Sequence, residues 1–323
     1  MSNIDQLLAL AEPCQLCPRQ CGTRRLSGEQ GFCQAGSEIQ ISYLGLHHGE
    51  EPPISGTRGS GTVFFGHCTM ACVFCQNWQI SQPPRGGVKS GAVSLSTISP
   101  PALAQKFLDL QAAGAHNINL VSPTQYAPWL AQAVSLAREK GLIVPIVYNT
   151  NGYERTEVLG LLADTIDIYL PDMKYADNVS AARYSQATNY TEHNLVAVKF
   201  MLKQKGLLQI KNDLAVQGVI VRHLVLPGLS KESQEILAAL YSLNPELPVS
   251  LMSQYAPRHQ AQNIPGLNRR LSAEEYAEAV AYAATLGLEN VWTQEITSQD
   301  IFVPDFGADE PFAASIEPER GGR

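Results

Sequence analysis

The seven cysteines of this 323-residue chain all lie before residue 76 and form two groups. The second group, Cys68, Cys72 and Cys75, directly follows the apolar run 63–65. A structural zinc site takes four protein ligands, so three thiolates leave one position open. On a four-iron cluster, one iron would then have no protein ligand and could bind a substrate. The spacing therefore predicts a metal centre that takes part in chemistry.

The first group, Cys14, Cys17, Cys21 and Cys33, has the spacing C-x2-C-x3-C-x11-C in a glycine-rich segment. Four thiolates can close a tetrahedral zinc site or hold an iron–sulfur cluster, and the sequence leaves both open. Four unrelated free thiols are the alternative. We expect a second metal centre here.

Arginines lie among these four cysteines, and they either offset thiolate charge or are solvated; they are Arg19, Arg24 and Arg25. Residues 1–13 do not have the pattern of a signal peptide. We therefore expect a reducing, cytoplasmic environment, in which cysteines bind metals or carry out redox chemistry rather than form disulfides.

The overall composition is typical of a globular protein with a large core, with 45% hydrophobic and 16% charged residues. The net charge of −7 argues against a general nucleic-acid or anionic-membrane surface, because both require clustered positive charge. No apolar run approaches the ~18 residues that span a bilayer. We expect neither nucleic acid nor membrane as a partner.

Short segments rich in Val, Ile and Leu alternate with helical patterns in the rest of the chain. The predicted strands are 62–67, 117–122, 143–149, 166–171, 217–226, 248–253 and 290–295. Ser230 is a predicted helix N-cap, and Ser272 with Glu275 predicts a capping box. Alternating βα units imply a parallel sheet with right-handed crossovers. The three-cysteine loop then follows the first of these strands, at the end where α/β barrels carry out chemistry.

The segment Cys68-Thr-Met-Ala-Cys72-Val-Phe74-Cys75 resembles the CxxxCxxC signature of the radical S-adenosylmethionine (SAM) superfamily, with an aromatic residue before the last cysteine. The resemblance implies that the three cysteines hold a [4Fe–4S] cluster whose open iron chelates SAM. Electron transfer then splits SAM and yields a 5′-deoxyadenosyl radical that abstracts hydrogen. A low-potential electron donor such as flavodoxin or ferredoxin is also implied. The implied fold is a partial (β/α)6 TIM-like barrel, with a doubly wound α/β sheet as the alternative.

Further segments resemble one branch of the superfamily, the pyruvate formate-lyase activating enzyme-like (PflX-type) proteins. They are the four-cysteine group, the loop 47–55, Gly59-Ser60-Gly61-Thr62 and Cys75-Gln76-Asn77. The loop 47–55 holds paired His and paired Glu residues. It could line a site, hold a metal or move a proton, or it could be a solvated loop, and its role stays open.

This resemblance covers residues 14–296 and suggests three parts. Residues 1–58 are a predicted Cys-rich metal-binding extension, residues 59–296 the barrel and residues 297–323 a C-terminal tail. We expect the tail to pack poorly, because it is rich in Gly, Pro and mixed charge.

Polar residues after the second and third predicted strands are candidates for binding SAM. Ser122 and Thr124 stand where many superfamily members have a Gly-Gly-Glu turn, so their hydroxyls could replace that contact, or the segment is an ordinary proline turn. Asn149 and Asn151 resemble the Thr-Asn-Gly turn of glycyl-radical-enzyme activases and could bind a ribose. An Asn-Gly turn without a ligand is the alternative.

The later strands add charged and aromatic candidates. Asp172 and Lys174 resemble the Asp-x-Lys of the same activases and could present opposite charges to a zwitterionic ligand. Arg222 lies in an apolar strand and needs an anionic partner, either the SAM carboxylate or an acidic side chain of the barrel. Tyr255 stands near the position of an activase Pro-Tyr-His segment that lacks its histidine here.

Three functions are consistent with these features. The first is activation of a glycyl radical enzyme by hydrogen abstraction, which Asp172, Lys174 and Arg222 favour. The second is radical modification of a small molecule or of another protein site, which the four-cysteine group and Ser122-Pro-Thr124 favour. The third is a non-catalytic iron–sulfur or zinc protein, which does not account for the polar residues at the strand ends.

Overall fold

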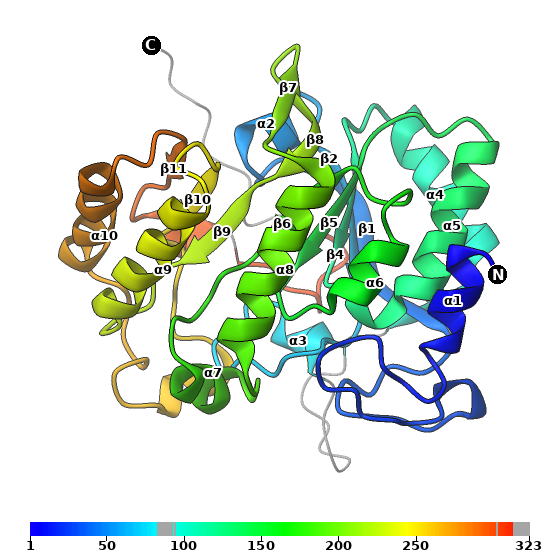
Figure 1. The fold of residues 1–323 in the computed structure, drawn as a ribbon, viewed down its shortest axis with the longest axis horizontal. Helices are drawn as coiled ribbons and strands as arrows, with labels where there is room; N and C mark the ends of the chain where they lie inside the picture. The colour runs from blue at the N-terminus through cyan, green and yellow to red at the C-terminus, as the bar shows by residue number, and fades with distance from the viewer. Residues whose placement is uncertain (83–92, 94, 302, 313–323) are drawn as a thin grey trace.

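The structure, a computed structural model, describes residues 1–82, 93, 95–301 and 303–312 (Figure 1). One sheet has the strand order β3-β1-β2-β4-β5-β6-β8-β7, and a second has the order β11-β10-β9. The strands are β1 (Ile39–His47), β2 (Ser60–Phe65), β3 (Ser96–Ile98), β4 (Ile118–Val121), β5 (Ile146–Thr150), β6 (Ile168–Pro171), β7 (Gln209–Lys211), β8 (Leu214–Val219), β9 (Val221–Leu224), β10 (Val249–Met252) and β11 (Val291–Thr293).

The predicted parallel sheet is confirmed. Strands β2, β4, β5, β6 and β8 pair in parallel in that order, and β9, β10 and β11 do so in the second sheet. The predicted strand 217–226 is divided into β8 and β9 at Ile220, although the Ile220 N–H still donates to the carbonyl oxygen of Tyr169 at 3.0 Å. A parallel bridge between Asp172 and Arg222 continues the pairing from β6 to β9, so the two sheets meet there.

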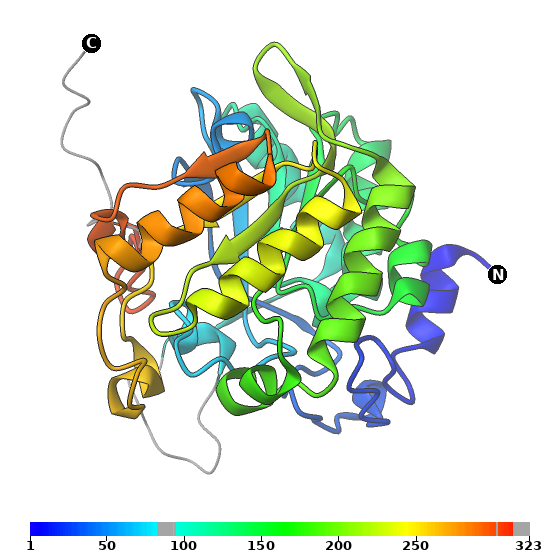
Figure 2. The same cartoon turned by 60° about the vertical axis from the view of Figure 1, so that its left-hand side comes forward.

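The helices follow the predicted alternation with the strands, and Figure 2 shows α9 and α10 packed side by side. They are α1 (Asn3–Ala9), α2 (Pro52–Ser55), α3 (Trp78–Ser81), α4 (Pro100–Ala112), α5 (Ala127–Glu139), α6 (Thr156–Leu161), α7 (Asn178–Ser185), α8 (Tyr190–Lys205), α9 (Ser230–Leu243), α10 (Ala273–Leu286) and α11 (Ser298–Ile301). Three short 3-10 helices are η1 (Arg25–Ser27), η2 (Thr124–Tyr126) and η3 (His259–Asn263). Among the described residues, no helix combines the length and apolarity that a membrane span requires.

The two cap predictions differ in outcome. The capping box of Ser272 and Glu275 is confirmed at the start of α10. The predicted N-cap Ser230 is wrong by one residue, because Leu229 holds the cap position of α9 and Ser230 already has helical geometry. A serine before an apolar pattern marks the start of a helix only approximately.

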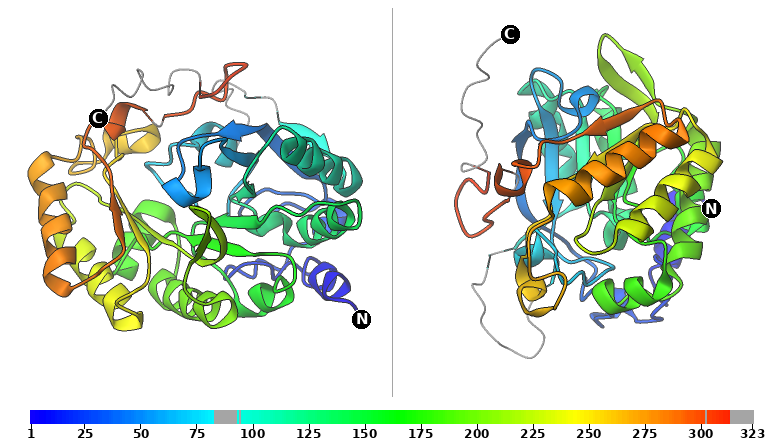
Figure 3. Two further views of the ribbon diagram at one scale, coloured as in Figure 1. Left: turned by 90° about the horizontal axis from the view of Figure 1, so that it is seen from above. Right: turned by 90° about the vertical axis from the view of Figure 1, so that its left-hand side faces the viewer.

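The two faces of the sheet are covered differently. Successive strand residues point to opposite faces, so Ile146 and Tyr148 join a large apolar cluster with α4, α5, α8, α9 and α10. Val147 instead joins a smaller cluster with Ile54 of α2. Figure 3 shows the long helices on one side of the strands and α2 on the other. A doubly wound sheet has long helices on both faces, so the observed arrangement differs from that alternative.

The N-terminal segment and the C-terminal tail are placed differently in the molecule. The segment 10–38 is mostly irregular and lies at the same end of the molecule as α3, opposite α2 (Figure 1). The predicted tail is partly outside the described residues, which omit 302 and 313–323. Its described part differs from the expected poor packing, because the rings of Phe306 and Phe312 lie 5.3 and 5.2 Å from that of Phe64. Aromatic rings bury a large apolar area, which explains this return to the sheet.

Candidate metal centre

The three-cysteine loop begins where β2 ends. His67 has a φ of 69°, in the left-handed region, and turns the chain out of the strand just before Cys68. Buried Gln125 donates from Nε2 to the carbonyl oxygens of Gly66 at 3.0 Å and His67 at 3.1 Å, which fixes this turn. The loop therefore lies at the carboxyl end of a parallel strand, where side chains from neighbouring strand ends converge.

Each of the three thiols lies within hydrogen-bond distance of a polar side chain from a different element. The pairs are Asn151 Nδ2 with Cys68 Sγ at 3.4 Å, Ser185 Oγ with Cys72 Sγ at 2.8 Å and Ser81 Oγ with Cys75 Sγ at 3.3 Å. Hydrogen bonds to sulfur are one of the ways in which proteins orient and tune metal-bound thiolates.

Burial and the nearby charge of Lys174 shift the pKa of two of the thiols in opposite directions. Burial raises the pKa of Cys72 to about 12 and that of Cys75 to about 11. The positive charge of Lys174 lowers the pKa of both and so favours their thiolates. Metals bind the thiolate, so metal binding here would release protons that burial otherwise retains.

Asp172 and Lys174 form an ion pair at 2.5 Å beside these cysteines. Burial lowers the pKa of Lys174, but the charges of Asp172 and Cys72 outweigh it, so the net shift is upward. The neighbouring turn packs closely, since Gly152 has a φ of 74° and an added Cβ would lie 2.2 Å from the carbonyl oxygen of Asp172. Buried Asn194 donates to the carbonyl oxygens of both residues, at 3.2 Å to Gly152 and 2.8 Å to Asp172. The Asn-Gly turn therefore holds the Asp172–Lys174 segment in place.

The asparagines predicted to bind SAM lie close to the cysteine loop. Asn151 is buried and donates to Thr69 Oγ1 at 2.9 Å as well as to Cys68, so its amide supports the loop itself. The carbonyl oxygen of Asn149 accepts from the N–H of Ser122 at 2.9 Å, and Ser122 has a φ of 55°. These residues at the carboxyl ends of β4 and β5 lie at the same end of the sheet as Cys68.

Thr124 and Tyr255, whose hydroxyls are predicted to bind the cofactor, donate to protein groups in this structure. Thr124 is buried and donates to Glu154 Oε1 at 2.5 Å. The hydroxyl of Tyr255 donates to the carbonyl oxygen of Leu267 at 2.6 Å, and its ring packs 5.9 Å from that of Phe74, edge to face. Each hydroxyl can still accept a hydrogen bond, so the role of these two residues toward the cofactor stays a prediction.

Arg222 has the acidic side-chain partner that was one of its two expected anions. Its guanidinium binds Glu51 in a bidentate manner, from Nε at 2.7 Å and Nη2 at 2.6 Å, and also pairs with Glu50. The charge of Arg222 keeps the pKa of Glu51 below its usual value although burial acts in the opposite sense. An acidic side chain is thus one partner of Arg222, as one of the two expectations had it. The segment 50–55 is therefore no solvated loop, because Glu51 is only 7% exposed.

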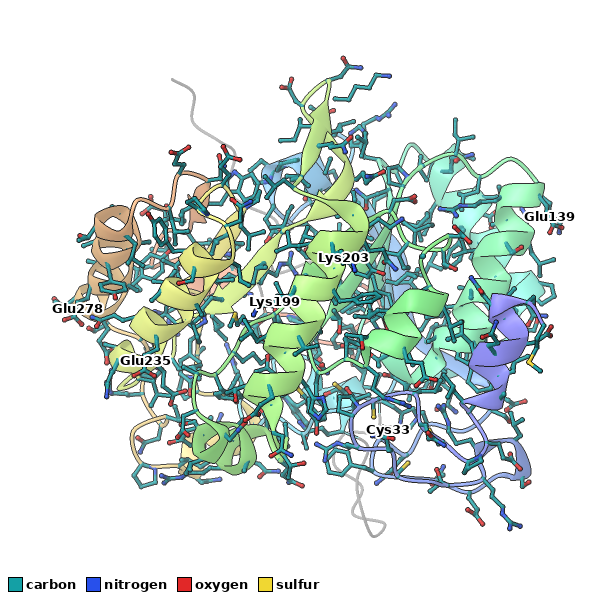
Figure 4. All side chains as sticks on the ribbon, viewed as in Figure 1. Cys33, Glu139, Lys199, Lys203, Glu235 and Glu278 are labelled. Carbon is teal, nitrogen blue, oxygen red and sulfur yellow. The ribbon has the colours of Figure 1, made fainter. Side chains whose placement is uncertain are left out.

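The four N-terminal cysteines surround one pocket. Its lining includes Cys14, Cys17, Cys21, Cys33, Arg19 and Arg25. Thr69 of the three-cysteine loop lines the same pocket. Figure 4 shows Cys33 where the N-terminal segment meets the body of the molecule.

The donor set fits an iron–sulfur cluster at Cys68, Cys72 and Cys75. Within the part of the chain that the structure describes, no three Cys, His, Asp or Glu side chains are close enough to share one metal ion. In a four-iron cluster each thiolate binds a different iron, so the thiolates need not converge on one ion. Three soft ligands, each with its own hydrogen-bond partner, are the chemistry that such a cluster requires.

Comparison with known proteins gives one relative that decides the family. The uncharacterized protein MJ0674 of Methanocaldococcus jannaschii is 32% identical over 282 residues, which cover 86% of this chain and 76% of the relative. The chain belongs to the MJ0674 family. The relative's name states no activity, and no protein-family model matches the chain.

Solved structures show only weak likeness. Streptococcus suis SuiB bound to S-adenosylmethionine has a TM-score of 0.48 and 10% identity over 71% of this chain, which spans about half of SuiB, 48%. Methylornithine synthase (PylB) has a TM-score of 0.45 and 14% identity over 80% of this chain and 74% of its own. Likeness at this level carries no functional conclusion for the MJ0674 family.

Several residues of the site were missed by sequence reasoning. Ser81 and Ser185 lie far from any motif, and nothing in a single sequence marks them. The partners of Arg222 had a signal, because adjacent carboxylates at Glu50 and Glu51 and a lone arginine in an apolar strand each need a counter-charge. Charge pairing along the chain could have suggested that contact, but only the fold brings the two segments together.

Proposed function

We propose that this protein is a radical SAM enzyme whose cluster is held by Cys68, Cys72 and Cys75. The observation that carries the proposal is a CxxxCxxC loop at the carboxyl end of β2, with a separate polar partner for each thiol. We further propose that the parallel strands form a partial (β/α)6 barrel around this site, with residues 1–58 as an extension and the chain in the PflX-type branch. The long helices on one face of the strands support the barrel.

A [4Fe–4S] cluster bound there would supply the electron that cleaves SAM to a 5′-deoxyadenosyl radical. The tasks of the chain are to hold the three thiolates and to keep Lys174 beside them. Ser185 and Asn151 donate to sulfur and so lower the cost of negative charge on the thiolates.

Asp172 and Lys174 are the proposed contacts for the amino acid end of SAM. Their opposite charges match the ammonium and carboxylate groups of a zwitterion, provided that SAM replaces part of their mutual ion pair. Ser122 and Asn149 lie at the ends of the neighbouring strands and are proposed to complete the SAM site. Arg222 is left out of the proposed site, because two glutamates already neutralise it.

The target of the radical is proposed to be a glycine of a partner protein, as in glycyl-radical-enzyme activation. The Asp172-x-Lys174 arrangement supports this choice over a small-molecule substrate. The test is whether the purified protein introduces a glycyl radical into a glycyl radical enzyme from the same source, detected by electron paramagnetic resonance. SAM cleavage that occurs without transfer to such a partner would favour a different substrate.

The decisive experiment measures SAM cleavage. The full chain is reconstituted anaerobically with iron and sulfide, reduced with dithionite and incubated with SAM, and 5′-deoxyadenosine is quantified by mass spectrometry. We expect product only with reductant and cluster present.

The matched variants separate the loop from the rest of the chain. Cys75→Ala should abolish product, whereas Ser242→Ala, at an exposed position of α9, should leave it at the wild-type level. Product from Cys75→Ala, or SAM binding without cleavage in a fully loaded wild-type protein, would overturn the assignment.

A further inference from the structure

The four thiols of the N-terminal group line one pocket. Cys14, Cys17, Cys21 and Cys33 all belong to its lining, and Cys14 and Cys17 are buried. No three of these thiols are close enough to share a single metal ion. In an iron–sulfur cluster each thiolate binds a different iron, so the thiolates need not converge on one ion. The pocket therefore has the ligands of such a cluster.

A buried arginine without an acidic partner is the second observation. Arg25 is 1% exposed, and among the described residues its Nε has no hydrogen-bond partner and no ion pair includes it. Its Nη2 donates to the carbonyl oxygen of Gly36 at 2.7 Å, and its Nη1 lies 3.9 Å from Cys14 Sγ. A buried guanidinium without an anion is costly. Four thiolates around a metal carry a net negative charge and would supply the missing counter-charge.

The pocket also adjoins the three-cysteine loop. Arg19 lies between Cys17 and Cys21 in the sequence and donates from Nε to the carbonyl oxygen of Thr69 at 2.6 Å. Its Nη2 donates to the carbonyl oxygen of Gln186 at 2.6 Å, next to the serine that contacts Cys72. The segment that would carry the second centre is thus tied to both sides of the first.

We propose that Cys14, Cys17, Cys21 and Cys33 bind one tetrathiolate metal centre, neutralised by Arg25. The centre is an iron–sulfur cluster with four thiolate ligands, because no three of these thiols are close enough to share one zinc ion. This site is independent of the proposed SAM chemistry, because it uses none of the same ligands.

The test removes the other centre first. The full chain with Cys68→Ser, Cys72→Ser and Cys75→Ser is purified anaerobically from cells supplied with iron and zinc, and zinc, iron and acid-labile sulfide are measured per chain. We expect iron with an equal amount of sulfide. Circular dichroism matching that of the wild type shows that the variant is folded.

Two further variants test whether the metal is bound in the four-cysteine pocket. Adding Cys21→Ser, which alters the most exposed of the four thiols, should cut the metal content of the triple variant severalfold or speed its loss to a chelator. Arg25→Met should also speed that loss, whereas Arg24→Met, at an exposed position of the same segment, should not.

Each outcome supports or overturns the cluster. Iron with sulfide in the triple variant, lost on substitution of Cys21, supports it. A folded triple variant that holds zinc without iron and sulfide, that holds neither metal, or whose metal is indifferent to Cys21→Ser overturns the proposal. Failure of SAM cleavage in the wild type would leave this result untouched, since the triple variant already lacks that site.

Discussion

The two cysteine groups occupy environments that differ in support and in charge. The loop of Cys68, Cys72 and Cys75 follows a buried strand, and each of its thiols has its own polar partner. The group of four lies in an irregular segment, where the thiols share one pocket with two arginines. In the first group each thiol is supported by a different side chain, whereas the four thiols of the second group line a common pocket.

This difference indicates different tasks. Three thiolates with separate hydrogen bonds and a lysine nearby suit a centre with an open position, whose charge changes during a reaction. Four thiolates around a pocket with a buried arginine suit a closed centre that stabilises its own segment. If the tasks differ, the two regions should respond separately to substitution.

The largest expected effect comes from Cys72→Ser. Loss of one of three ligands should reduce SAM cleavage to background while the metal of the four-cysteine group stays in place. Metal analysis and 5′-deoxyadenosine assays on the same sample measure both. If this single change empties both groups, the two regions are not separate sites.

Arg19→Ala should weaken the link between the regions. It removes two hydrogen bonds to backbone carbonyl oxygens, at Thr69 and Gln186, and we expect the free energy of unfolding to fall by about 1–3 kcal/mol. Hydrogen exchange should rise in both segments together. Arg24→Ala is the exposed control. A rise confined to the N-terminal segment would show that Arg19 does not connect the two.

Glu154 is buried, its charge acts on Cys17 of the four-cysteine group, and it predicts a pH dependence of stability. Burial raises its carboxyl pKa to about 7 from a usual value of 4.5, although Thr124 and Thr150 donate to it. Between these two pH values the native state binds more protons than the unfolded state, so the free energy of unfolding falls as pH rises, by at most about 3 kcal/mol. Above about pH 7 the Glu154 carboxyl group is ionised in both states, so the free energy of unfolding no longer changes with its titration.

Glu154→Gln should remove this slope, and urea unfolding from pH 4.5 to pH 8 measures it. The control is Glu139→Gln, at an exposed position of α5, which should leave the slope unchanged. A variant with the wild-type slope would assign the dependence to other groups.

The smallest expected effect is that of Ser185→Ala. Removing the 2.8 Å hydrogen bond to Cys72 should make the reduction potential of the proposed cluster more negative by about 20–60 mV, since such a bond contributes about 0.5–1.5 kcal/mol. Redox titration followed by electron paramagnetic resonance measures the shift, with Ser242→Ala as control. An unchanged potential would mean that the serine only packs against the loop.

The parallel sheet and most of its strands could be predicted, because buried strands need continuous apolar runs and the helices between them need a 3.6-residue period. The packing of the tail could not. Phe306 and Phe312 are two aromatics among polar residues, and no local pattern shows that they return to Phe64. The same holds for Arg222, for which sequence reasoning required an anion but did not identify Glu50 and Glu51.

The sequence by itself determined which residues can bind metals, because ligand type and spacing are local properties of Cys68, Cys72, Cys75 and the four earlier cysteines. It also determined the alternation of strands and helices. Only the tertiary structure decided which polar groups reach those thiols and which charges neutralise each other. Those contacts join segments far apart in the chain, such as Ser185 with Cys72, and a long-range contact depends on how every element between its partners packs.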